Sequence, residues 1–222
     1  MDNPVSAARK FLARLPRKAA LRAAFAVGVV CVGTALWLSR THWHWQSSPH
    51  PETARYTERQ GSVVPLADVF TSYDSVASAS ARLAAKGFRP LRSSSNKPAS
   101  RRYPPRDLDT FTVENYEYLS QGGRLILEFF NDRLYEARFE PEDVKRFTQR
   151  LHAIEPELRR DRIGMSELVR GDQRISSNVD LAANKVGRFL ETRPYVIWQD
   201  RRLKQQLGEW ELRYGPEAAH PD

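Results

Sequence analysis

The stretch FTVENYEYLSQGGRLILEFFNDRLYEARF, residues 111–139, decides the fold class of this chain. Residues 111–119 are rich in strand formers, and SQGG at 120–123 has the composition of a turn. The segments 124–130 and 134–139 have the pattern of a second and a third strand. Three consecutive strands joined by short turns predict an antiparallel β-meander.

Side-chain alternation supports this interpretation. The Asn-Asp dipeptide at 131–132 suits a tight hairpin turn, because both residue types tolerate left-handed backbone. In the third strand we expect the charges of Glu136 and Arg138 to face water. Apolar side chains recur at every second position of the second strand: Leu125, Leu127 and Phe129.

Two amphipathic helices are predicted on either side of the meander. The first runs from Ser75 to Lys86, and Gly87 supplies a left-handed stop. The second opens at the segment 140–143, whose proline and acids suit a first helical turn, and ends at Pro156.

A third helix is predicted near the C-terminus. It follows a compact apolar strand at 195–198, begins after Asp200 as its cap, and ends at Gly215 and Pro216. The alternative is an alternating strand at 210–214, and we favour the helix. Its buried face would carry Leu203, Leu207, Trp210 and Tyr214.

These elements predict an α+β domain over residues 63–216, either one mixed domain or two subdomains dividing near 156. Residues 158–186 are harder to interpret. We expect a short helical turn at 163–168 and strands at 173–177 and 179–182. Residues 217–222 are predicted to be a disordered tail.

The N-terminal quarter has a different character. Residues 1–18 form a basic segment, and 19–39 can span a membrane as one helix, with sixteen uncharged residues at 23–38. Residues 40–62 contain two prolines and many polar side chains, which predicts an interfacial stalk. The residues expected at the membrane interface are Arg22, Trp37, Trp43 and Trp45.

The distribution of charge supports an anchor and argues against nucleic acid as a partner. The chain has a formal charge of +8, yet residues 1–46 alone carry seven basic residues against one acid. The remaining 176 residues hold 28 basic and 26 acidic side chains. Because a nucleic-acid-binding domain would carry its surplus charge on its own folded surface, we expect no such partner.

The same charges orient the predicted anchor. Basic residues before the apolar run place the N-terminus in the cytoplasm, at the inner membrane, and the C-terminal domain in the periplasm. Cleavage as a secretory signal and use as a mitochondrial presequence are the alternatives, and we favour retention as a single-pass anchor. The one cysteine, Cys31, lies inside the apolar run, so the fold has no internal disulfide.

Residues 92–106, RSSSNKPASRRYPPR, are predicted to form a loop. The loop has basic side chains and no acid, so it could bind an anionic partner such as a phospholipid head group or an acidic protein surface. A solvated surface loop is the plainer interpretation. The candidate residues are Arg92, Lys97, Arg101, Arg102, Tyr103 and Arg106.

The sequence lacks the usual patterns of catalytic and cofactor sites. It has no G-x-S-x-G, no S-x-x-K and no glycine-rich phosphate loop before a helix. The pair His42 and His44 lies between tryptophans at the expected membrane boundary, so we predict no metal site there, and we expect no cofactor. An enzyme would need a pocket that gathers distant polar groups, for example Asp172, Asn178, Asp180 and Tyr195.

Two functions of different classes remain. The first is a membrane-anchored, non-enzymatic envelope protein whose α+β domain binds a protein partner or assists a membrane assembly, for example by strand addition at a sheet edge. The second is an enzyme or ligand-binding module that acts on envelope material such as peptidoglycan or lipid. We favour the first.

Overall fold

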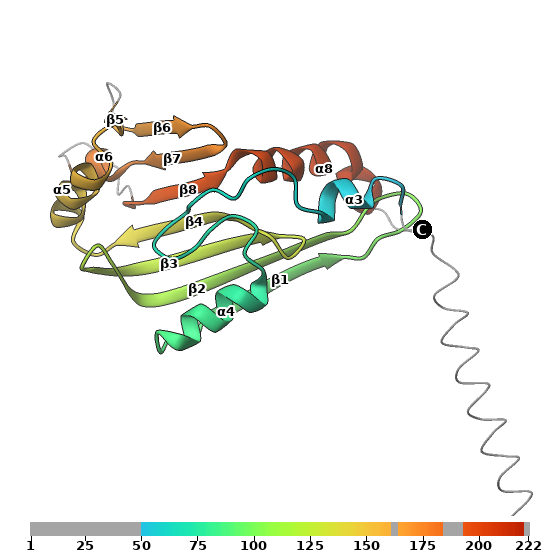
Figure 1. Cartoon of the computed structure of the whole chain (residues 1–222), viewed down its shortest axis with the longest axis horizontal. Coiled ribbons are helices and arrows are strands. Elements are labelled where there is room, and N and C mark those ends of the chain that lie inside the picture. The colour runs from blue at the N-terminus through green and yellow to red at the C-terminus, as the bar shows by residue number, and fades with distance from the viewer. Residues whose placement is uncertain (1–49, 161–163, 184–192, 220–222) are drawn as a thin grey trace, which may run out of the picture. The chain divides into compact units, whose positions relative to one another are not determined.

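The computed structural model describes residues 50–160, 164–183 and 193–219. These described residues belong to one compact unit. The described part is a mixed α+β fold built on one antiparallel sheet (Figure 1), which confirms the fold class expected from residues 111–139.

The elements of the described residues have the following bounds. The strands are β1 (Leu91–Lys97), β2 (Arg106–Tyr118), β3 (Gln121–Phe130), β4 (Leu134–Pro141), β5 (Arg159–Arg160), β6 (Ser166–Arg170), β7 (Gln173–Ser177) and β8 (Val196–Asp200). The helices are α3 (Thr53–Thr57), α4 (Val76–Ala85), α5 (Val144–Ile154), α6 (Val179–Ala183) and α8 (Arg201–Ala219).

The strand order is β1-β2-β3-β4-β8-β7-β6-β5, and every neighbouring pair is antiparallel. Strands β1 to β4 follow one another along the chain. Strand β8 lies between β4 and β7, so strands from both sides of residue 156 join one sheet. In Figure 1, α5 and α6 lie at one end of this sheet and α3 and α8 at the other.

One face of the sheet carries the main core. The alternating residues predicted in β3 are fully buried there, and α4 and α5 add Leu83, Phe147 and Leu151. The segment between α3 and α4 crosses this face and buries Leu66 and Phe70 (Figure 1). Burial of apolar surface on this face is the main force that holds the helices to the sheet.

A second, smaller core lies at one end of the sheet. All four residues of the predicted C-terminal stripe belong to it, which confirms the helical interpretation of 210–214. Its members are Tyr56, Phe130, Tyr135, Leu203, Leu207, Trp210 and Tyr214.

A bulge in β4 directs the Tyr135 side chain toward the second core. Glu128 of β3 pairs with Glu136, whereas the next residue, Phe129, pairs with Leu134. Tyr135 is therefore one extra residue in β4, and such an insertion reverses the face on which a side chain points. The expectation that Glu136 faces water was wrong. Glu136 is only 4% exposed, because α8 covers this part of β4.

The capping regions of the first two predicted helices can be compared with the structure, and Asp200 caps α8 as expected by accepting from Arg202 N and Leu203 N. Ser75 caps α4 by accepting a hydrogen bond from Ser78 N, and Gly87 adopts φ +82°, as expected. The start of α5 differs, because Pro141 ends β4 and Asp143 caps the helix through Arg146 N. A proline without an N–H is also compatible with the end of a strand, so its presence did not distinguish the two positions.

The turn between β2 and β3 is shifted from its predicted place. It is formed by Leu119 and Ser120, both at φ +52°, and Gly122 and Gly123 belong to β3. Gly123 is needed for close packing instead: a Cβ there would lie 2.5 Å from the Glu140 carbonyl oxygen and 2.6 Å from the Phe139 ring.

Other local predictions change where the sequence was ambiguous. Strand β7 is confirmed. The helical turn expected at 163–168 is strand β6 from residue 166 onward, and the strand expected at 179–182 is helix α6. Helix α8 continues through Pro216 to Ala219. Pro216 is exposed, so water can replace the helical hydrogen bond that proline removes.

The predicted stalk at 40–62 does not hold for its described part. Residues 53–57 form α3, and the Tyr56 side chain is fully buried in the second core. The membrane segment 19–39 and its interface residues, from Arg22 to Trp45, lie outside the described residues. Among those that are described, no helix is long and apolar enough to cross a membrane.

Candidate binding groove at the edge strand

β1 forms one edge of the sheet, in the region where the sequence predicted only a loop. It pairs with β2 from Leu91 opposite Thr112 to Lys97 opposite Arg106. Six of its seven residues are exposed, and no other described strand pairs with its outer side. Such an edge presents a row of backbone N–H and C=O groups that can accept a further strand.

The sequence of β1 suits the approach of another backbone. Ser93, Ser94 and Ser95 have small side chains, and Pro90 and Pro98 stand on either side of the strand. Because proline cannot donate to a ladder, the two prolines limit strand addition to about the length of β1. The opposite edge, β5, has only two residues.

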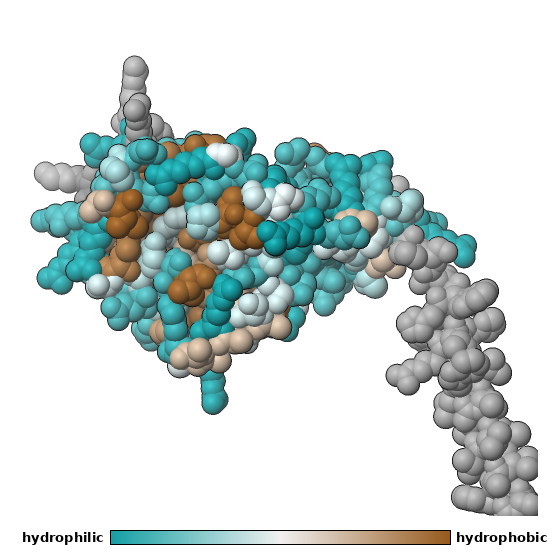
Figure 2. Space-filling view, viewed as in Figure 1, coloured by the Kyte–Doolittle hydropathy of each residue, from teal (hydrophilic) through white to brown (hydrophobic). Residues whose placement is uncertain are grey.

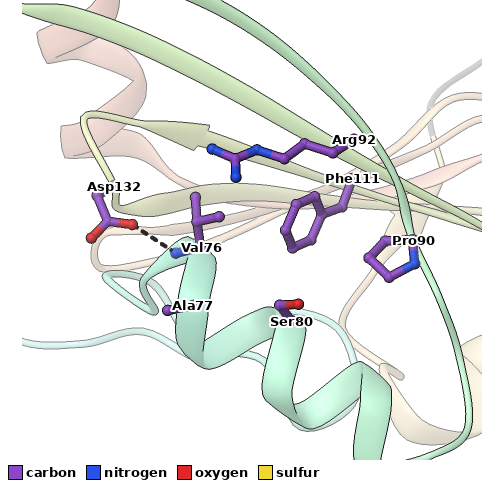
Figure 3. A pocket seen from close by; sticks show the side chains of 7 residues that line it. All are labelled: Val76, Ala77, Ser80, Pro90, Arg92, Phe111 and Asp132. Carbon is purple, nitrogen blue, oxygen red and sulfur yellow. Dashed lines mark hydrogen bonds between the residues drawn. The ribbon is translucent and has the colours of Figure 1, made fainter.

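A groove of about 580 Å³ lies beside β1, between this edge and helix α4 (Figure 3). Its volume falls in the range of roughly 300–1,000 Å³ that is typical of ligand sites. Figure 3 shows the side chains of Arg92 and Phe111 on neighbouring strands, both on the side that faces α4. The groove is lined by Val76, Ala77, Ser80, Pro90, Arg92, Phe111 and Asp132.

Arg92 is the basic side chain of the groove. Its Nε donates to Asp109 Oδ1 at 2.8 Å, and the Ser94 hydroxyl donates to the same oxygen. The hydrogen bond and charge of Asp109 raise the pKa of Arg92, so the guanidinium stays charged. Half of the Arg92 side chain remains exposed, whereas Asp109 is almost completely buried.

The other end of the groove is closed by the N-terminus of α4. Asp132, in the turn between β3 and β4, accepts a hydrogen bond from Val76 N at 2.8 Å (Figure 3). Together with Ser75 it satisfies backbone donors of the first helical turn. The backbone N–H groups at the N-terminus of α4 thus already have hydrogen-bond acceptors. The parts of the groove that remain for a ligand are the edge strand and the apolar floor.

The structure separates the six residues of the predicted anion-binding loop into two groups. Arg92 and Lys97 belong to β1, and Arg101 is exposed beyond it. Arg102 is likewise exposed. The other two, Tyr103 and Arg106, contact α8.

The contacts with α8 fix the end of this segment. The Tyr103 ring lies 6.2 Å from the Trp210 ring, and Trp210 Nε1 donates to the Pro104 carbonyl at 3.1 Å. Arg106 Nε lies 2.6 Å from Glu211 Oε1. Tyr103 and Arg106 therefore support the fold, and the basic side chains nearest the open edge are those of β1 and its flanks.

The polar residues proposed for an enzyme pocket do not come together. Asp172 pairs with Arg202 at 3.2 Å before β7, whereas Asn178 follows the other end of β7. Asn178 uses its amide to hold the backbone of Arg193 and Tyr195.

Asp180 forms a separate cluster with His152. His152 Nε2 lies 3.0 Å from Asp180 Oδ2, and the Ser166 hydroxyl donates to the same oxygen at 3.1 Å. The carboxylate lies between the histidine and the serine, so the histidine has no direct hydrogen bond by which to activate the hydroxyl. Within the described ranges, no group of three or more His, Cys, Asp or Glu residues could hold a metal ion.

Exposed hydrophobic side chains give no single large patch. Figure 2 shows small hydrophobic areas among hydrophilic ones on the face that it draws. The large exposed hydrophobic residues of the described chain come from separate elements: Val69, Leu91, Ile154, Val169 and Leu212. A partner that docks by a broad apolar surface is therefore less well supported than one that uses backbone and polar contacts.

Sequence reasoning missed the groove because its parts come from four distant segments. More than fifty positions separate Val76 from Asp132, and Phe111 lies between them in the sequence. These residues meet only through sheet pairing and helix packing. The signal that could have located β1 was the pair of prolines around a seven-residue segment. A comparison with models of known protein families and a comparison with curated proteins both find no match.

Proposed function

We propose that this chain is a membrane-anchored, non-enzymatic protein of the cell envelope whose α+β domain binds a partner protein on the periplasmic side. The observation that carries the proposal is the open edge of β1 beside a groove with an apolar floor. Strand addition at such an edge is a common mode of peptide recognition, because main-chain hydrogen bonds supply affinity and a neighbouring pocket supplies specificity.

The anchor is supported by the sequence of residues 1–46. An uncharged run at 23–38 is preceded by six basic residues and followed by tryptophans. This order of basic, apolar and aromatic residues is typical of a single-pass segment with its N-terminus in the cytoplasm. Nothing in the proposal requires cleavage or a cofactor.

Membrane placement is tested with the full chain fused at its C-terminus to a reporter that is active only outside the cytosol. We expect reporter activity in cells and recovery of the chain with membranes after ultracentrifugation. A reporter that works only in the cytosol, or a chain that stays in the aqueous fraction without detergent, would show that the placement is wrong.

Partner binding is tested in intact cells with a photo-crosslinking residue at Ser93 in β1. We expect a discrete crosslinked envelope protein, and none from the same residue placed at Lys145, which is exposed on α5. No crosslink from any surface position would contradict partner binding. Turnover of peptidoglycan or lipid by the purified full chain would favour the enzymatic alternative instead.

A further inference from the structure

We infer that the occupant of β1 is an acidic, extended segment of the partner protein, about seven residues long, that adds to the sheet and places one apolar side chain in the groove. This inference rests on the proposed function and names the chemistry of the partner. Its basis is the charge, length and surroundings of the edge strand.

The charge along the edge has one sign. Residues 89–106 contain six basic side chains and no acid. Arg89 and Arg101 are exposed on either side of β1, and Arg92 is half exposed within it. A strand added to β1 would pass Arg92 and Lys97, and its ends would approach the flanks that carry Arg89 and Arg101. Opposite charges on neighbouring strands stabilise a pair.

The acids near the groove are already used within the domain. Asp109 is buried and bonded to Arg92 and Ser94, and Asp132 accepts from the first turn of α4. Burial and the nearby Asp109 raise the pKa of Asp107, on β2 behind β1. These carboxylates lie inward of β1, so they oppose an acidic partner less than the basic side chains of the edge attract it.

A second copy of this chain fits the edge less well. Antiparallel pairing of two β1 strands would bring two basic segments 89–106 side by side. Like charges on an exposed edge are a common means by which proteins resist self-pairing. The same charges complement an acidic strand, so the edge selects for a different partner.

The groove provides for one apolar side chain. Phe111 forms its floor, and Val76 and Pro90 form its walls (Figure 3). On an added strand, side chains alternate between the two faces of the sheet. Those on the α4 side, next to Arg92, point toward this groove and are expected to be apolar. In an alternating segment the acidic residues then lie on the opposite face, which carries Lys97 of β1.

The test measures binding of three labelled seven-residue peptides to the full chain in zwitterionic nanodiscs. The first alternates glutamate and valine, the second has lysine in place of glutamate, and the third has a proline at the centre of the first. We expect the first peptide to bind and the second not to bind. The third keeps the charge but cannot complete the ladder, so it should bind about tenfold more weakly.

Two variants of the protein separate edge charge from total charge. In R89Q/R101Q, both changes are exposed and outside β1, and we expect affinity for the first peptide to fall about threefold. The matched control R146Q/R174Q removes the same charge from α5 and β7, distant from β1, and should leave affinity unchanged.

Besides failure of all the peptides to bind, three results would overturn the inference. These are equal binding of the first and third peptides, binding of the lysine peptide, and dimerisation of the chain that competes with peptide. Binding to phosphatidylglycerol nanodiscs that is lost in R89Q/R101Q, with no peptide binding, would assign the edge to lipid instead. If peptides fail while Ser93 still crosslinks a partner in cells, the inference is wrong and the proposed function stands.

Discussion

Glu136 is a carboxylate in an almost fully buried position. Its Oε2 accepts from Gln199 Nε2 at 2.5 Å and lies 3.7 Å from Lys204 Nζ, while Glu128 occupies the paired position on β3. Burial, with a smaller contribution from the charge of Glu128, raises the pKa of Glu136 above its usual value near 4.5. The folded state therefore holds this proton more tightly than the unfolded state.

This difference makes a prediction about stability and pH. The stabilisation from the protonated form is complete below the unfolded pKa near 4.5 and is lost as the pH rises through the raised folded pKa. We expect the stability of E136Q, which is neutral throughout, to rise relative to that of the parent as the pH is raised above 4.5. The measurement is the free energy of unfolding by chemical denaturation at several pH values.

E117Q is the matched control, because Glu117 is exposed on β2 and the change in charge is the same. Its stability relative to the parent should change by less than about 0.5 kcal/mol over this range. If E136Q and E117Q show the same pH dependence, burial of Glu136 does not determine its ionisation.

At the scale of elements, the turn between β2 and β3 contains no glycine, whereas β3 contains two, Gly122 and Gly123. Leu119 and Ser120 adopt the left-handed backbone that a tight hairpin turn requires. Gly123 lies against β4, where Phe139 and the backbone of Glu140 leave no room for a Cβ. Gly122 meets only the end of the Glu142 side chain, at 3.2 Å.

The two neighbouring glycines are therefore expected to differ in their tolerance of alanine. G123A forces β3 and β4 apart or displaces the Phe139 ring, so it should cost about 1–3 kcal/mol of stability. G122A can be accommodated by rotation of Glu142 and should change stability by less than about 0.5 kcal/mol. Thermal or chemical unfolding of both variants tests this, and equal effects would contradict the packing role of Gly123.

At the scale of the whole molecule, Arg133 connects segments that are far apart in the chain. It is 5% exposed, and its guanidinium donates to the carbonyls of Tyr56 and Glu58 and to Gln206 of α8. Burial lowers its pKa to about 10. The residue thus attaches the first described helix, α3, to both the β3–β4 turn and the C-terminal helix.

Removal of this connection should release α3 while the sheet remains folded. In R133M the Glu58 carbonyl and the buried side-chain oxygen of Gln206 lose their donor, whereas the Tyr56 carbonyl keeps its hydrogen bond from Asn131 Nδ2. Loss of the donor to the buried Gln206 oxygen costs about 1–3 kcal/mol. We expect faster trypsin cleavage after Arg55 and Arg59, both exposed, with little change in the far-ultraviolet circular dichroism. The control R174M removes an exposed arginine of β7, and cleavage near α3 as slow as in this control would contradict the connecting role.

Predictions for elements with apolar periodicity were correct, whereas those for β1 and α3, which lack such periodicity, were wrong. The amphipathic helices α4 and α8 and the alternating strand β3 were predicted correctly, because their periodicity records which face is buried. Strand β1 was mistaken for a loop, since RSSSNK has no apolar alternation and contacts β2 through its backbone and through polar side chains that bond to Asp109. Helix α3 was mistaken for part of a stalk, because one buried tyrosine gives no periodic signal.

By itself, the sequence determined the α+β class, the antiparallel meander and the separation of a basic, apolar N-terminal segment from a nearly neutral domain. Hydrophobic periodicity and charge are local properties, so they can be read along the chain. Only the tertiary structure decided that β8 lies between β4 and β7, that Tyr135 turns into a second core, and that β1 borders a groove formed with α4. These features depend on contacts between residues distant in sequence, where pairing and packing in three dimensions select the neighbours.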